Sequence, residues 1–317
     1  MKPASEISDL PDGFAVATAA MDADVRTVAA PTEPSRVNDF YELTKPRMNF
    51  LIVITTMVGY FMASRGDANW TRLLHTLLGT ALTASGAGVL NQLIEREYDK
   101  LMPRTRNRPL PAGRVAPAEA VCYGVALGVA GVTYLAILVN ALTASLGALT
   151  LLSYLFIYTP MKRRTTLNTV IGAVPGAIPP VMGWTAVHNV IQPEAIALFA
   201  ILFFWQMPHF LAIAILYRND YKAGGFKMLP VVDEDLIITG RQIVLYAVAL
   251  VPVTLMPTVI GMAGSAYFTA AMLLGLAFLS FAISCAATRT RSDARKLFFA
   301  SIIYLPLLLA VMMLNKM

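Results

Sequence analysis

Apolar residues in this chain stand in long blocks rather than in short runs that alternate with polar residues. A helix needs about 18 or more such residues to cross a hydrocarbon core of ~30 Å. Because lipid cannot satisfy an open backbone, each block is predicted to form an α-helix. The pattern predicts an all-α integral membrane protein with about nine transmembrane helices, at residues 48–64, 73–94, 117–138, 142–160, 168–187, 195–216, 240–260, 266–287 and 297–315.

The composition agrees with this pattern. The 317 residues are 57% hydrophobic and 14% charged, whereas soluble domains carry about 25% charged residues. Polar side chains inside a span are costly, so each one that occurs there needs a functional or structural reason. Proline and glycine are tolerated between neighbouring helices, and the cluster Pro175–Pro180 predicts a kink in the fifth span.

Residues 1–45 differ from the rest of the chain in being polar and rich in alanine, aspartate, proline, serine and threonine. They lack the apolar h-region of a signal peptide, and their eight acids against four basic residues are atypical of a mitochondrial transit peptide. We expect residues 1–45 to form a disordered N-terminal tail and residues 46–317 to form the transmembrane domain.

Basic residues mark one side of the membrane. The four segments that follow the even-numbered spans hold 17 of the 25 lysines and arginines. The N-terminal part through Arg47 holds five more, whereas the loops after the odd-numbered spans hold only Arg65 and Arg72. Because lysine and arginine favour the cytoplasmic side, the N-terminus is predicted inside and the C-terminus outside. Seven acids lie on the same predicted side, which suggests a shared site there (Glu95, Glu97, Asp99, Asp220, Asp233, Glu234 and Asp235).

Charge and cysteine content exclude other classes of site. The net charge of +6 does not indicate nucleic-acid binding, because the basic residues cluster in short loops between spans. Cys122 and Cys285 lie in separate apolar segments without a cysteine or histidine neighbour. Neither a disulfide framework nor a zinc site is therefore expected.

Three polar residues share one helix face at the end of the second span. Asn91, Glu95 and Asp99 are spaced by four, and each step of four turns a helix by only about 40°. An amide and two carboxylates are hard oxygen ligands of the kind that Mg²⁺ binds together with substrate phosphates. The alternative is a solvated helix end, with the acids paired to Arg96 and Lys100.

Two basic segments lie on the same predicted side. Residues 104–113 place Arg104 and Arg108 on a proline- and glycine-containing loop, a composition that suits bidentate phosphate recognition. Such a loop also serves as a positive anchor or a binder of anionic lipid. Tyr158 and Lys162, followed by Arg163, end the fourth span and share a helix face. They suit a departing diphosphate, or form a snorkelling helix end.

A polar stripe continues through the sixth span. Gln206, His209, Tyr217 and Asp220 fall on one helical face, and His209 is the only histidine well inside a predicted span. A single core histidine is often only hydrogen-bonded, yet polar groups at membrane depth are costly and frequently functional. Asp220 is the natural metal ligand on this second side of the site.

These motifs are similar to those of the UbiA superfamily of intramembrane prenyltransferases. Asn91-x3-Glu95-x3-Asp99 resembles the first Asp-rich motif of that superfamily, with Glu95 where many members have aspartate, and Arg-Thr-x-x-Arg-Pro-Leu at 104–110 belongs to the same pattern. In the second Asp-rich motif only Asp220 matches, because Gly224 takes the place of the other acid. The segments 158–180, 205–210 and 218–231 resemble the branch of the superfamily that farnesylates heme.

The resemblance implies a UbiA-type helical bundle with a polar cap at the cytoplasmic face. It implies transfer of a farnesyl group from farnesyl diphosphate to the vinyl group of heme b, giving heme O and diphosphate. Mg²⁺ is the implied cofactor, and heme b is a substrate. The implied catalytic residues are Asn91, Glu95, Asp99, Lys162 and Asp220; the metal ligands are Asn91, Glu95, Asp99 and Asp220; the diphosphate ligands are Arg104, Arg108, Tyr158, Lys162 and Arg163; and the heme contacts are His209, Gln206 and Tyr217.

The same resemblance gives expectations about setting and partners. The protein is expected in a bacterial inner membrane, in contact with the lipid bilayer and not with nucleic acid. A heme A synthase or an oxidase assembly factor is the suggested protein partner. Two alternatives stay open: an aromatic acceptor, as in quinone biosynthesis, and a transporter. The stretch 205–210 disfavours the first, and the lack of a visible inverted repeat disfavours the second.

Overall fold

Helices make up almost all of the part of the chain that the structure describes. The computed structural model describes residues 35–64, 66 and 68–317, and no strand occurs among them. Nine helical segments of this described part are long and apolar enough to cross a membrane, which confirms the predicted fold class. The elements are α2 (Arg36–Leu43), α3 (Pro46–Ala63), α4 (Trp70–Asp99), α5 (Pro117–Leu138), α6 (Ala141–Leu152), η2 (Ser153–Tyr158), α7 (Thr159–Met161), α8 (Asn168–Ala177), α9 (Pro179–His188), α10 (Pro193–Leu216), α11 (Arg218–Ala223), α12 (Leu229–Val232), α13 (Ile237–Val259), α14 (Ser265–Thr288) and α15 (Arg291–Leu314).

The predicted tail overlaps this described part at its end. Residues 36–43 form α2, so the expectation of disorder is wrong for them. Asp39 and Leu43 of α2 are buried, which gives this helix a packed face that its short polar sequence does not announce. Residues 1–34, the rest of the predicted tail, lie outside the described residues.

The second span is longer than its apolar block. α4 runs for 30 residues and continues five residues beyond the predicted end at position 94. This extension keeps Asn91, Glu95 and Asp99 on one continuous helix, as their spacing requires. α4 packs closely on α5, because a side-chain carbon on Gly86 would lie only 2.5 Å from the backbone nitrogen of Gly128.

Proline divides the fifth span, as predicted. α8 ends at Ala177 and α9 begins at Pro179, with Ile178 between them and Pro175 inside the last turn of α8. Proline lacks the amide hydrogen that a continuous helix needs and crowds the preceding turn, so the axis bends there. The two halves face different neighbours: α8 packs on α10, and α9 packs on α3.

The fourth span contains a turn that the sequence does not reveal. After α6, residues 153–158 form one turn of π-helix, η2, before α7 completes the span. The backbone amide of Thr159 bonds to the carbonyl of Tyr154, five residues earlier instead of four. Such turns are rare and occur frequently at functional sites. This one shifts the register of Thr159 and Lys162 relative to α6.

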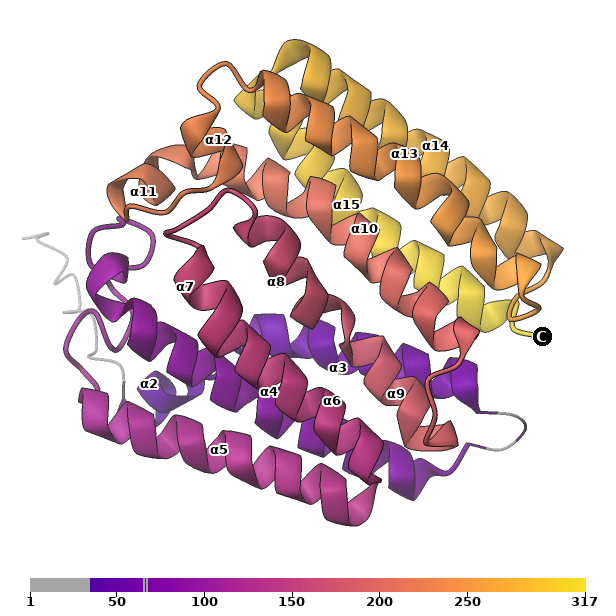
Figure 1. Ribbon diagram of the computed structural model, residues 1–317, viewed down its shortest axis with the longest axis horizontal. Coiled ribbons are helices and arrows are strands. Elements are labelled where there is room, and N and C mark those ends of the chain that lie inside the picture. Colours follow the sequence, from indigo (N-terminus) through magenta and orange to yellow (C-terminus); the bar gives the residue numbers. More distant parts are fainter. Residues whose placement is uncertain (1–34, 65, 67) are drawn as a thin grey trace, which may run out of the picture. The chain divides into compact units, whose positions relative to one another are not determined.

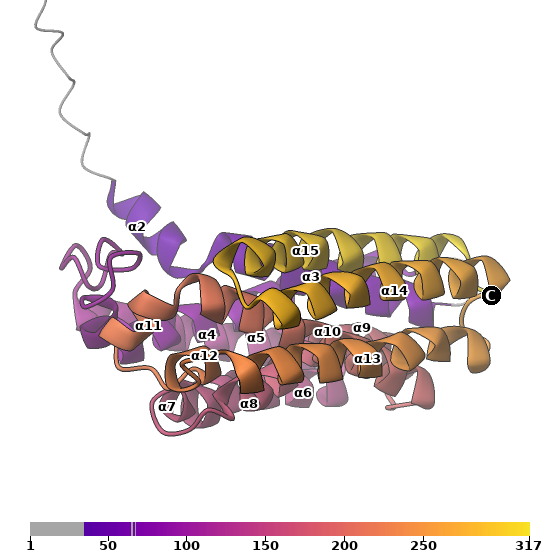
Figure 2. The ribbon, with the colours of Figure 1, turned by 90° about the horizontal axis from the view of Figure 1, so that it is seen from above.

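The helices lie side by side, and the polar segments gather at one end of the bundle. α10, α13, α14 and α15 pack on one another, with their buried apolar side chains in one large cluster (Figure 1). The short elements α7, α11 and α12 and the loop after α4 lie at one end, and the C-terminus lies at the other (Figures 1 and 2). The segments after the even-numbered spans therefore meet in space.

Candidate active site

The last two turns of α4 carry three buried polar side chains into this end of the bundle. Asn91 and Asp99 are each 1% exposed and Glu95 is 6% exposed. Their spacing of four places them along one face, as the sequence predicts. Buried carboxylates need a partner, because removing an ionised group from water costs several kcal/mol. Each of the three has one.

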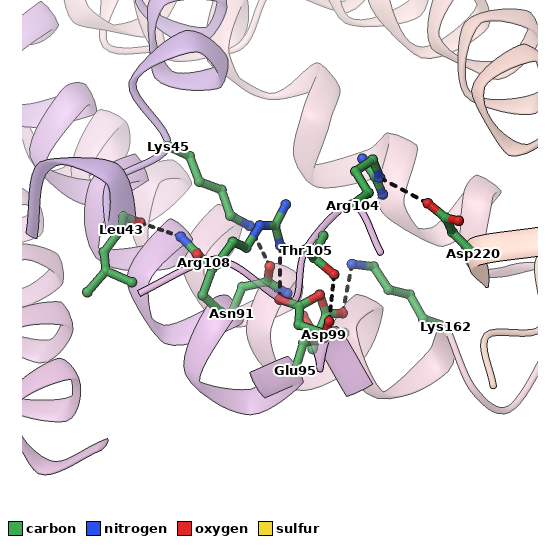
Figure 3. Close-up of polar contacts among 12 residues, drawn as sticks. Leu43, Lys45, Asn91, Glu95, Asp99, Arg104, Thr105, Arg108, Lys162 and Asp220 are labelled. Atoms are coloured by element: carbon green, nitrogen blue, oxygen red, sulfur yellow. Dashed lines mark hydrogen bonds and ion pairs between the residues drawn. The ribbon is translucent and has the colours of Figure 1, made fainter. Parts of the chain in front are cut away.

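The two carboxylates are held by cations from other segments. Lys162 Nζ lies 2.7 Å from Glu95 Oε1, and Arg108 Nη1 lies 2.9 Å from Asp99 Oδ2 (Figure 3). Both cations belong to the predicted diphosphate-binding set. The structure therefore brings the predicted metal ligands and the predicted anion ligands into direct contact. The alternative pairing of these acids with Arg96 and Lys100 does not occur, since both of those side chains contact Glu97.

Asn91 is held at both ends of its amide. Lys45 Nζ donates to Asn91 Oδ1 over 2.6 Å, and Asn91 Nδ2 donates to Thr159 Oγ1 over 3.0 Å (Figure 3). The neighbouring Gln92 donates its side-chain amide to the carbonyl of Leu43. The connection between α2 and α3 is thereby tied to α4 at the level of Asn91.

The two lysines differ in their electrostatic surroundings. Burial, together with the nearby charges of Lys162 and Arg108, lowers the pKa of Lys45 to about 7, while Glu95 and Asp99 act in the opposite sense. Burial also acts to lower the pKa of Lys162, but Glu95, Tyr158 and Tyr154 together outweigh this effect and hold the pKa well above its usual range. Lys162 is thus a permanent cation of this cluster.

The loop after α4 folds back over the acids. Thr105 Oγ1 donates to the backbone carbonyl of Asp99, which closes the turn that leads to Arg108. The guanidinium carbon of Arg104 lies 4.6 Å from the ring centre of Tyr217 and 5.7 Å from that of Tyr221. Arg104 Nε is 4.0 Å from Asp220 Oδ2 (Figure 3). Arg104 therefore connects the first polar segment to the second.

The end of the fourth span lies between these two sides. Lys162 Nζ is 4.7 Å from the ring centre of Tyr158, which packs so closely on Gly172 of α8 that a side-chain carbon there would overlap the ring. Arg163 lies over the ring of Tyr98 at 4.0 Å and donates to its hydroxyl group over 2.5 Å. We call Asn91, Glu95, Asp99 and the basic side chains that contact them the acid cluster. Lys162 thus belongs to this cluster and Tyr158 packs beside it, whereas Arg163 contacts Tyr98 at the edge of the cluster.

The three predicted heme contacts have different neighbours. Gln206 is buried, donates to the carbonyl of Leu202 and packs against Gly176 of α8. Tyr217 contacts Arg104 as described. His209 faces α15 and shares no contact with the acid cluster. Its ring is stacked between Trp205, at 4.9 Å, and Phe298, at 5.3 Å.

The tautomer of His209 follows from its hydrogen-bond partner. His209 Nδ1 lies 2.7 Å from Ser301 Oγ, and Ser301 Oγ donates its only proton to the carbonyl of Phe298 over 2.6 Å. With this proton on Phe298, Ser301 accepts from His209, and Nδ1 carries the proton. In the neutral ring Nε2 then keeps its lone pair.

The oxygen atoms of this site fit a magnesium ion. Asn91, Glu95 and Asp99 present one amide and two carboxylate oxygens on one face, and Mg²⁺ typically takes one or two carboxylates with phosphate oxygens completing its shell. Among the described residues there is no group of three histidine, cysteine, aspartate or glutamate side chains that could hold a metal ion on its own. The set therefore suits a metal shared with a bound diphosphate rather than a closed protein cage. Asp220 contacts Arg104 and faces this set from α11.

Sequence reasoning missed two residues of the cluster, Lys45 and Thr159. Lys45 directly precedes Pro46 at the start of the first span. The sequence pattern indicates only that it is one of the basic residues that orient the spans in the membrane. Its positive φ of 54° turns the chain into α3. Thr159 follows the tyrosine of the Tyr158/Lys162 pair, and only the π-helical turn brings its hydroxyl group to Asn91. A lysine at the inner end of an apolar span is the one signal that the sequence offers.

Curated proteins similar to this chain span nearly its whole length. A protoheme IX farnesyltransferase of Solibacter usitatus is 49% identical over 289 residues, which cover 88% of this chain and 99% of that protein. A protoheme IX farnesyltransferase of Myxococcus xanthus is 44% identical over 284 residues, covering 89% and 96%.

Solved structures share the fold at low identity. A structure of digeranylgeranylglyceryl phosphate synthase superposes with a TM-score of 0.72 at 16% identity, covering 88% of this chain and 98% of that chain. A UbiA homolog from Archaeoglobus fulgidus, bound to DMAPP and Mg²⁺, gives a TM-score of 0.65 at 16% identity, covering 86% and 99%. The sequence also matches the UbiA prenyltransferase family over residues 52–303, so the chain belongs to that family.

Proposed function

We propose that this protein transfers a farnesyl group from farnesyl diphosphate to a vinyl group of heme b, giving heme O and diphosphate. The observation that carries the proposal is the cluster of buried oxygen ligands on α4, each paired with a cation, at the end of an apolar helical bundle. Such a cluster suits a charged head group whose apolar chain runs down among the helices. The relatives named protoheme IX farnesyltransferase supply the acceptor.

In this proposal the α4 cluster binds the diphosphate together with Mg²⁺. Asn91, Glu95, Asp99 and, from the other side, Asp220 would hold the metal, as the A. fulgidus homolog bound to DMAPP and Mg²⁺ suggests. Mg²⁺, when bound, would stabilise the charge that develops on the leaving diphosphate. The cations that now contact these oxygens would turn to the phosphates: Arg104, Arg108, Lys162 and, at the edge, Arg163.

The reaction needs charge stabilisation and no protein nucleophile. The bond between the allylic carbon and the diphosphate oxygen breaks, and the electron pair leaves with the diphosphate. The heme vinyl group attacks the allylic cation, and water captures the resulting heme cation and releases a proton. Lys162, whose pKa lies well above its usual range, would supply a fixed positive charge beside the departing diphosphate, with Tyr158 packed next to it.

For the heme we propose contacts on α10. His209 is the candidate axial ligand, because its Nδ1 is fixed by Ser301 and its Nε2 keeps the lone pair that iron binds. Gln206, facing α8, would lie beside the porphyrin. Tyr217 would contact the acceptor near Arg104.

The setting completes the proposal. We place the protein in a bacterial inner membrane with its active site and N-terminus on the cytoplasmic side, the side on which the basic segments gather. Residues 46–317 would form the prenyltransferase domain, and residues 1–45 precede it in the sequence. A heme A synthase or an oxidase assembly factor would receive the product.

A product assay tests the function directly. Purified protein is incubated with heme b, farnesyl diphosphate and Mg²⁺, and the heme product is analysed by mass spectrometry. We expect a gain equal to one farnesyl group plus one hydroxyl group, with release of one diphosphate. Heme of unchanged mass would overturn the proposal. A parallel incubation with an aromatic quinone precursor in competition with heme b tests the acceptor, and preferential prenylation of the aromatic ring would reassign it.

A further inference from the structure

Thr159 forms a hydrogen-bond relay between the π-helical turn and Asn91. Its hydroxyl group donates to the carbonyl of Tyr154 over 2.8 Å and receives the Asn91 Nδ2 amide over 3.0 Å. Thr159 is 3% exposed, so water does not compete for either bond. Neither Thr159 nor Tyr154 takes part in the binding of metal, diphosphate or heme proposed above.

The donor and acceptor roles in this relay follow from the partners of Thr159. Its hydroxyl group gives its single proton to the carbonyl of Tyr154, which can only accept. In this arrangement Thr159 offers Asn91 a lone pair and faces the amide nitrogen. The amide oxygen of Asn91 faces Lys45.

Lys45 fixes the same orientation from the other end. In its protonated form Lys45 only donates, and its Nζ lies 2.6 Å from Asn91 Oδ1. If the amide were reversed, its nitrogen would face this donor, and Thr159 would have to turn its proton from Tyr154 to the amide oxygen. The observed orientation satisfies both partners of Asn91 in a buried site.

The π-helical turn explains why Thr159 can do this. In an ordinary α-helix a threonine hydroxyl bonds to the carbonyl four residues back, as Thr150 does to Leu146. Here the turn widens, and both the amide and the hydroxyl group of Thr159 bond to Tyr154, five residues back. The wider turn brings the hydroxyl group within reach of α4.

We infer that Thr159 is a positioning residue that holds the amide oxygen of Asn91 toward the metal. This inference rests on the proposed function, in which Asn91 is a metal ligand. Groups that orient a metal ligand commonly alter metal affinity by roughly 10- to 100-fold when they are removed. Thr159 acts through Asn91, so the loss of its hydroxyl group should weaken metal binding without removing a ligand.

The test replaces the hydroxyl group and measures metal binding without turnover. Thr159→Val keeps the shape of the side chain but cannot accept from Asn91. Binding of Mn²⁺ to the purified protein, with farnesyl diphosphate present and heme absent, is followed by EPR, and a protein-free titration is subtracted. We expect Thr159→Val to weaken the binding of Mn²⁺ by roughly ten-fold or more. Thr159→Ser, which restores the hydroxyl group, should bind Mn²⁺ like the wild type. Thr150→Val, in the same span, is the matched control and keeps wild-type binding.

A double variant shows whether Thr159 acts through Asn91. Asn91→Ala removes the ligand itself, and Thr159→Val is then added to it. We expect the double variant to bind Mn²⁺ no more weakly than Asn91→Ala alone, because residues that act through one another are not additive. Additive losses would show that Thr159→Val damages the site by another route and would overturn the inference.

The outcomes separate this inference from the proposed function. If Asn91→Ala weakens the binding of Mn²⁺ while Thr159→Val does not, the metal assignment stands and the positioning role is wrong. If Asn91→Ala and Glu95→Gln both leave Mn²⁺ binding unchanged, the metal assignment itself fails. If Thr159→Ser is as weak as Thr159→Val, the methyl packing and not the hydroxyl group matters, and the inference is again wrong.

Discussion

At the scale of single residues, three cations from three different segments converge on one face of α4. Lys45 reaches Asn91, Lys162 reaches Glu95, and Arg108 reaches Asp99. A buried ion pair is costly to assemble and is seldom a source of stability by itself. Two such pairs, with a lysine hydrogen-bonded to Asn91 beside them, are better explained by a charged ligand that uses both the acids and the basic side chains. Substitutions of these buried polar residues are therefore expected to affect activity strongly.

Glu95→Gln and Asp99→Asn are therefore expected to lose turnover while the protein still inserts into the membrane. Each change removes the negative charge that is proposed to bind the metal but keeps the size of the side chain. We expect a fall of roughly 100- to 1,000-fold in kcat, the range seen when one preorganised charge-stabilising group is lost. Product formation by mass spectrometry measures kcat, and membrane extraction checks insertion.

Glu97→Gln is the matched control on the same helix. Glu97 is exposed and pairs with Arg96 and Lys100, so it should tolerate the change. Glu95 and Asp99 are buried and should therefore tolerate substitution poorly, unlike the exposed Glu97. Full activity of either Glu95→Gln or Asp99→Asn would remove that residue from the metal site.

His209→Ala tests the proposed heme contact. If Nε2 binds iron, the variant should shift the Soret band of bound heme and reduce the rate of farnesylation. Trp205 and Phe298, which flank the ring of His209, are unchanged in this variant. His188→Ala is the control, because His188 contacts the carbonyl of Ala63 near the other end of the bundle. An unchanged spectrum and rate in His209→Ala would exclude His209 from the site.

At the scale of elements, α2 acts as a brace for the loop after α4. Asp39 Oδ1 is buried and lies 2.8 Å from Arg114 Nε, and Arg114 also donates to the backbone carbonyl of Asn107 over 3.0 Å. Glu42 lies 3.7 Å from the same guanidinium group. Asn107 precedes Arg108, the partner of Asp99. The carboxylates of α2 thus hold the loop in the position from which Arg108 reaches the site.

Asp39→Asn is expected to loosen this loop. A hydrogen bond to a charged group contributes about 1.5–3 kcal/mol, and every 1.4 kcal/mol is a factor of ten. We expect hydrogen exchange of residues 104–114 to quicken by roughly ten-fold and the KM for farnesyl diphosphate to rise. Arg36→Gln is the control, since the Arg36–Glu119 pair is exposed and such pairs contribute little to stability.

A charge-reversed pair completes this test. Asp39→Arg combined with Arg114→Asp restores an attraction between α2 and the loop and should recover part of the protection. If Asp39→Asn leaves both exchange and KM unchanged, α2 does not brace the loop.

The elements also show where sequence reasoning succeeds and where it stops. Apolar blocks fix the nine spans because lipid leaves only a helix for each, and the spacing of Asn91, Glu95 and Asp99 places them on one face. The π-helical turn at Ser153–Tyr158 has no such signature, so the reach of Thr159 could not be foreseen. The helix at residues 36–43 is not predicted because its sequence is polar. Its buried residue Asp39 pairs with Arg114, which lies 75 residues further along the chain.

At the scale of the whole molecule, the basic segments and the acid cluster lie at the same end of the bundle (Figures 1 and 2). The same charges can therefore serve two purposes. Lysine and arginine in short loops orient the spans during insertion, and the subset that is buried among acids is the one proposed to bind the substrate. In the proposed orientation, farnesyl diphosphate would enter from the cytoplasm.

This shared use predicts the accessibility of both ends. In a variant without native thiols, Cys122→Ser with Cys285→Ala, single cysteines are placed at Ala223→Cys in α11 and Ser265→Cys at the start of α14. Both positions are exposed and uncharged, so the charge pattern is kept. A membrane-impermeant thiol reagent should label Ser265→Cys in intact cells and Ala223→Cys only in inverted vesicles. The opposite labelling would place the acid cluster outside, away from a cytoplasmic supply of farnesyl diphosphate, and would contradict the orientation while leaving the geometry of the cluster unchanged.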